Sequence, residues 1–150
     1  RFGTVFSRPD DVSAWLARNE DALVDELERL DGAAEWAVTI VPREAVEPEV
    51  VGAGGYLERR AAAGEALARR AQRVAEQAGP WHERLAAHAE TAVRKPGRGV
   101  ALDAAYLVRS NQQRAFDAAV LDLQSDLGDE FELRLTGPWP PFSFVAQHLQ

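Results

Sequence analysis

The histidines have the widest chemical repertoire in this sequence, because an imidazole can bind a metal ion or transfer a proton near neutral pH. His82 and His88 are six positions apart, which places their side chains on different faces of a helix. The zinc-protease pattern needs a second histidine four positions after the first, and Ala86 occupies that position. We therefore expect no metal site.

A glycine-rich stretch at residues 52–55 resembles a phosphate-binding loop only in composition. No Lys-Ser or Lys-Thr pair follows it, and the last glycine of a dinucleotide-binding pattern would fall on Leu57. We interpret the stretch as a flexible hinge. No serine lies in a Gly-x-Ser-x-Gly elbow, and the chain has no cysteine that could act as a nucleophile. The sequence therefore predicts neither an enzyme nor a bound cofactor.

Charge and hydropathy argue against two classes of partner, nucleic acids and membranes. The 150 residues carry a formal net charge of -7, which repels a phosphate backbone, so nucleic acid is not an expected partner. No apolar run approaches the ~20 residues needed to cross a bilayer, so a membrane is not expected either. The absence of cysteine favours a cytoplasmic location.

The C-terminal segment, residues 137–150, has the most unusual composition. Residues 137–144 read Gly-Pro-Trp-Pro-Pro-Phe-Ser-Phe. The prolines stiffen the backbone and keep it out of a sheet interior, while the aromatic rings can cover a large area at little entropic cost. We favour a clasp over the open face of the domain's own core, in which Trp139 fills a buried site. The alternative is a contact with a partner protein.

Two β-α-β units are expected to form the domain that carries the histidines, the glycine-rich stretch and the C-terminal segment. The first, residues 1–41, contains a strand at residues 1–6, an amphipathic helix that ends at Gly32, and a strand at residues 36–40. The second, residues 100–136, contains strands at 100–108 and 131–136 around a helix that follows the capping-box pair Ser110 and Gln113 and ends at Gly128. Between the units, residues 42–55 read as a loop and residues 56–93 as one long helix that Pro80 kinks or breaks.

This pattern predicts a single α+β domain with a ferredoxin-like antiparallel sheet, helices on one face, and a long helical insertion between the units. The strands at Phe2, Val38, Tyr106 and Leu133 are expected to share one sheet, backed by the helices that contain Leu16 and Val120. Because the chain begins at Arg1, without an initiator methionine or a signal peptide, we also expect a natural N-terminal module to be missing.

The segment at residues 137–144 resembles the signature of the gas vesicle protein L/F (GvpL/GvpF) family, whose members usually read Gly-Pro-Trp-Pro-Pro-Tyr-Ser-Phe. Phe142 stands in place of the tyrosine and removes one hydroxyl. Further matches occur along the chain, in the same order as in the family: residues 1–6, Gly32 with Glu35-Trp36, residues 55–57 and residues 105–108.

The resemblance implies an accessory protein in gas vesicle organisation, located at the gas vesicle, that assists shell assembly and supplies no catalytic residue or cofactor. Its implied partners are the small hydrophobic shell protein and other gas vesicle accessory proteins. The alternative is a ferredoxin-like regulatory module that binds a small ligand. The candidate partner-binding or signature residues are Trp139, Pro140, Pro141, Phe142 and Phe144 in the C-terminal segment, Tyr56, Leu57, Ala71 and Ala78 on the long helix, and Tyr106 on the third strand.

Overall fold

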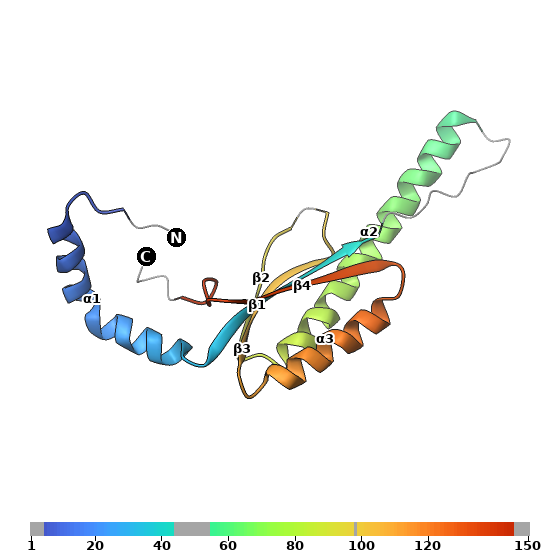
Figure 1. The fold of residues 1–150 in the computed structure, drawn as a ribbon. Helices are drawn as coiled ribbons and strands as arrows, with labels where there is room; N and C mark the ends of the chain where they lie inside the picture. The colour runs from blue at the N-terminus through green and yellow to red at the C-terminus, as the bar shows by residue number, and fades with distance from the viewer. Residues whose placement is uncertain (1–4, 44–54, 98, 146–150) are drawn as a thin grey trace.

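Four antiparallel strands with two helices on one face form the body of the protein (Figure 1). The computed structural model describes residues 5–43, 55–97 and 99–145. The strands are β1 (Ala33–Pro42), β2 (Thr91–Arg94), β3 (Leu102–Arg109) and β4 (Phe131–Trp139), and the helices are α1 (Pro9–Leu30), α2 (Tyr56–Ala86) and α3 (Gln113–Leu127).

The sheet order β2-β3-β1-β4, with every neighbouring pair antiparallel, gives a β-α-β-β-α-β arrangement from β1 to β4. This is the ferredoxin-like arrangement, and the α+β class is therefore confirmed. The core lies between the sheet and its helices, where alternate residues of β1 and β3 meet α3 and the second half of α2. Its largest fully buried side chains include Ile40, Leu85, Tyr106, Phe116 and Leu123.

The two units are not composed as predicted. The expected helical insertion, α2, is the crossover helix of the first β-α-β unit and joins β1 to β2. Residues 91–93, predicted as helix, belong to β2, because pairing with β3 overrides the helical propensity of this alanine-rich stretch. α2 also continues through Pro80 without a break.

The predicted strand at residues 1–6 is not part of the sheet as described. Residues 1–4 lie outside the described residues, and Val5 and Phe6 are not in a strand. The expected hinge glycines Gly52 and Gly54 also lie outside the described residues. The fourth strand of the sheet is β2 instead.

The prediction that the helix containing Leu16 backs the sheet is wrong. No residue of α1 is buried, and the helix extends away from the sheet, at the end opposite to the projecting start of α2 (Figure 1). The helix-bearing face of the sheet is covered by α2 and α3, which pack against one another and against the strands. Two helices suffice to cover one face of a four-stranded sheet, so α1 has no place in this layer.

Candidate partner-binding surface

The face of the sheet without helices carries a row of four aligned residues whose two central members are unexpectedly buried. Trp139, Glu35, Leu107 and Thr91 are aligned across β4, β1, β3 and β2. Leu107 is fully buried and Glu35 is only 5% exposed, although neither α2 nor α3 covers this face. Another part of the chain must therefore lie over the row.

The covering segment is residues 140–145, which we call the strap. Both carboxylate oxygens of Glu35 accept hydrogen bonds from Ser143: its backbone N–H donates over 2.7 Å and its hydroxyl over 2.7 Å. The Lys95 ammonium lies 3.7 Å from the same carboxylate. A buried carboxylate is tolerated only when it is paired and hydrogen-bonded, and Ser143 and Lys95 meet that requirement.

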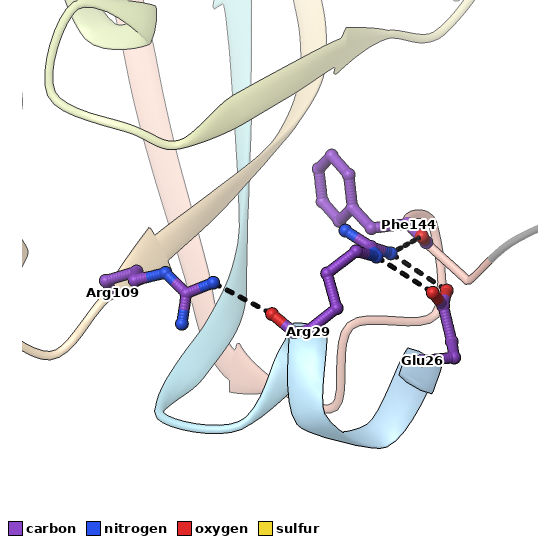
Figure 2. A network of polar contacts seen from close by, with 4 residues as sticks. All are labelled: Glu26, Arg29, Arg109 and Phe144. Atoms are coloured by element: carbon purple, nitrogen blue, oxygen red, sulfur yellow. Dashed lines mark hydrogen bonds and ion pairs between the residues drawn. The ribbon is translucent and has the colours of Figure 1, made fainter. Parts of the chain in front are cut away.

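A second anchor joins the strap to α1 (Figure 2). The Arg29 guanidinium donates to the Phe144 carbonyl over 2.7 Å and to both carboxylate oxygens of Glu26 over 2.8 Å. The hydrogen bond with Glu26 raises the pKa of Arg29. The end of α1 and the strap are therefore held together.

Arg109 ties the same junction to β3. Its guanidinium donates to the carbonyls of Arg29, over 2.8 Å, and Asp31, over 2.9 Å, and forms an ion pair with Glu90. A cation at the end of a helix satisfies free carbonyls and interacts favourably with the helix dipole. Arg109 therefore fixes the end of α1 relative to the sheet.

The strap follows a bulge that explains the Gly-Pro pair of the signature. Glu35 pairs with Trp139 but Ala37 pairs with Thr136, so two residues of β4 lie opposite Trp36. Gly137 has a φ of +138°, and a Cβ there would lie 2.8 Å from the Glu35 carbonyl oxygen and 2.9 Å from the Trp36 ring. The Gly137–Pro138 peptide is cis. β4 therefore continues to Trp139, because an edge strand tolerates proline at a bulge.

Two signature aromatic residues face solvent at this end of the sheet. Trp139 is 51% exposed and Phe142 is 49% exposed. The Trp139 indole N–H donates to the Thr136 hydroxyl over 3.3 Å. The expectation that Trp139 fills a buried site is therefore wrong. The strap does lie over the open face, but its described anchors are polar ones at Ser143 and Phe144.

Several other predicted site residues lie apart from this surface. Tyr106 is fully buried, packs on Phe116 and has its hydroxyl 3.0 Å from His82 Nδ1. Burial raises the pKa of Tyr106 and lowers that of His82. Ala78 is 1% exposed, so neither Tyr106 nor Ala78 is available to a partner. The remaining candidates, whose side chains fall outside the described part of the structure, are Tyr56, Leu57 and Ala71.

The sequence prediction missed the residues that hold the strap, namely Glu35, Arg29 and Arg109. An available signal was Glu35-Trp36, which accompanies the C-terminal signature in the family pattern. Nothing in the local sequence distinguishes Glu35 from a solvent-facing strand residue, because its partner Ser143 lies 108 positions away.

The described residues contain neither a cluster of metal-binding side chains nor a helix that could span a membrane. Across ranges 5–43, 55–97 and 99–145, no three histidine or acidic side chains gather in a way that could hold a metal ion. Within the same ranges, the helices lack the combination of length and apolar character that a membrane span requires.

A family model described as gas vesicle synthesis protein GvpL/GvpF matches residues 1–146. Gas vesicle protein L of Streptomyces sp. (strain CB03234) is 31% identical over 166 residues, covering 97% of this chain and 61% of that protein. Gas vesicle protein F of the same organism is 31% identical over 163 residues, covering 97% of this chain and 68% of that protein.

Solved structures show the same fold. The crystal structure of GvpF from Anabaena sp. PCC7120 superposes with a TM-score of 0.67 at 16% identity, covering 97% of this chain and 65% of that one. The crystal structure of GvpF from Microcystis aeruginosa superposes with a TM-score of 0.65 at 18% identity, covering 97% of this chain and 68% of that one. The chain thus spans roughly two thirds of the length of these relatives.

Proposed function

The chain belongs to the GvpL/GvpF family of gas vesicle synthesis proteins, and from this premise we propose that it is a non-catalytic accessory protein that assists assembly of the gas vesicle shell. In this proposal it binds the small hydrophobic shell protein through the strap and the adjoining end of β4, with Trp139 and Phe142 as the anchors.

The observation that carries the proposal is the exposure of two large aromatic side chains on a backbone that is held in place. Trp139 and Phe142 each leave about half of their surface in solvent. Between them, Pro140 and Pro141 restrict the backbone, and Ser143 is bonded to Glu35. Exposed aromatic residues in a fixed geometry favour binding, because little conformational entropy remains to be lost on association.

The acidic character of the chain is compatible with this role. A shell subunit with large apolar faces would aggregate if left unprotected, and a partner with a net charge of -7 would keep the complex dispersed. The alanine stripe of α2, our sequence-based choice for docking, is less suitable because Ala78 packs inside the domain. The alternative role, binding of a small ligand on the open sheet face, would compete with Ser143 and Lys95 for Glu35.

The proposal is tested by replacing both aromatic residues, Trp139→Ala and Phe142→Ala, and measuring binding to purified shell protein. We expect affinity to fall by at least about tenfold, which is within the range for aromatic hot spots. Leu121→Ala is the matched control, because Leu121 is a 65% exposed apolar residue on α3. Undiminished binding by the double variant, with both proteins folded, would exclude this surface.

A further inference from the structure

The outer side of α1 presents an apolar stripe that no described part of the chain covers. Leu16, Val24 and Leu27 are 47%, 47% and 71% exposed. They lie eight and three positions apart, close to whole helical turns, and therefore share one side of the helix. Val12, Leu23 and Leu30, which are more than half buried, lie beside the same stripe. Leu16, Val24 and Leu27 thus form one exposed apolar face.

Acidic residues lie within and beside this stripe. Glu20 lies one turn from both Leu16 and Val24, and Glu28 lies one turn beyond Val24. α1 contains seven acidic and two basic residues, so most of the net negative charge of the chain is concentrated here. In the described part of the chain, the carboxylates of Glu20, Asp21, Asp25 and Glu28 have no ion-pair partner. Their charge is therefore available to an approaching molecule.

α1 is also held in a defined direction. Arg109 binds the carbonyls of Arg29 and Asp31 at its end, and the Arg29 side chain binds Phe144 of the strap (Figure 2). A helix that projects from the body at a fixed junction (Figure 1) offers a docking site whose orientation is set in advance, which lowers the entropic cost of association.

From these three features we infer that α1 is a docking site for an amphipathic helix of a partner protein, whose apolar stripe is bordered by lysine or arginine residues. The apolar side chains of the two helices would pack along Leu16, Val24 and Leu27, and the basic border would pair with Glu20 and Glu28. The α1 helix of a second copy does not meet this description, since two helices with the same excess of negative charge repel one another. The inference concerns a surface separate from Trp139 and Phe142 and does not depend on the shell protein.

The test uses the full chain and two synthetic 22-residue helical peptides that share a leucine stripe. One peptide has lysine and arginine at the border positions, and the other has glutamate there. Fluorescence anisotropy should show the basic peptide binding at least about tenfold more tightly, and added salt should reduce this difference because it screens exposed charges. Leu16→Gln with Leu27→Gln should abolish binding, whereas the control Leu121→Gln on α3 should not.

Charge reversal provides the decisive variant, because exposed substitutions leave the fold intact. Glu20→Lys with Glu28→Lys should invert the preference, so that the acidic peptide binds more tightly than the basic one. Equal binding of the two peptides, or binding that survives loss of Leu16 and Leu27, would overturn the inference. So would sedimentation of the unmodified chain as a dimer that Leu27→Gln dissociates, since a second copy would then occupy the stripe.

Discussion

At the scale of single residues, Glu35 joins two parts of the chain that lie more than one hundred positions apart. Its carboxylate receives the N–H and the hydroxyl of Ser143, and it is almost completely withdrawn from water. Strand alternation predicts Trp36, Val38 and Ile40 as the inward-facing set and leaves Glu35 on the other side. No local rule predicts that this other side is also covered, because the cover comes from the C-terminal strap.

We expect Glu35→Gln to lower the free energy of unfolding by about 1–3 kcal/mol, the usual cost of an unpaired buried polar group. A carboxamide keeps one acceptor oxygen but presents an N–H₂ group where the carboxylate accepted a second bond, so one Ser143 donor loses its acceptor. Chemical denaturation measures the change. Glu132→Gln is the control, since its pair with Arg134 is exposed to solvent and should contribute little to stability. Equal effects of the two substitutions would show that the strap contributes no stability through Glu35.

At the scale of elements, sequence patterns predict the helices and strands whose side chains alternate between core and solvent. The helix expected between Ser110 and Gly128 is observed as α3, and strands are correctly expected around Val38, Tyr106 and Leu133. The four-residue β2 is missed, because a strand that short has almost no periodicity and depends on its pairing with β3. The end of β4 is missed because prolines usually end a strand, and here Gly137 makes a bulge that accommodates Pro138.

The bulge predicts a contrast between two glycines. Gly137→Ala should destabilise the protein by roughly 2 kcal/mol or more, since φ is +138° and the new methyl group would meet the Glu35 carbonyl oxygen at 2.8 Å. Gly79→Ala on α2 should be neutral or stabilising by up to ~1 kcal/mol, because nothing lies within 4 Å of its Cβ position and alanine favours a helix. Thermal unfolding of both variants checks the prediction. A Gly137→Ala protein that melts at or above the unmodified temperature would contradict the described bulge.

At the scale of the whole molecule, the α+β class and the ferredoxin-like arrangement follow from the sequence, whereas the assignment of helices to units does not. Both α1 and α2 are amphipathic helices followed by a strand, so either can be read as a crossover helix. Packing decides between them: α2 covers the sheet through Leu85 and Ala78, and α1 buries no residue. Which of the two helices packs on the sheet depends on how well each fits the same sheet face in three dimensions, and a single sequence does not show this.

The contrast between a packed sheet and an α1 helix that buries no residue predicts two levels of stability within one chain. Backbone amides of β3 should exchange with solvent only on global unfolding, because β3 lies between β1 and β2 and is buried on both faces. Amides of α1 should exchange at least about a hundredfold faster, a difference of ~3 kcal/mol, since α1 contributes no residue to the core. The last turn of α1 should be slower than the first, because Arg109 binds its terminal carbonyls. Hydrogen exchange followed by mass spectrometry measures all three regions together.

The same measurement tests α1 as a docking helix. Addition of the basic amphipathic peptide should slow exchange in α1 and leave exchange in β3 unchanged. Protection of α1 equal to that of β3 in the free protein would mean that α1 already has a partner.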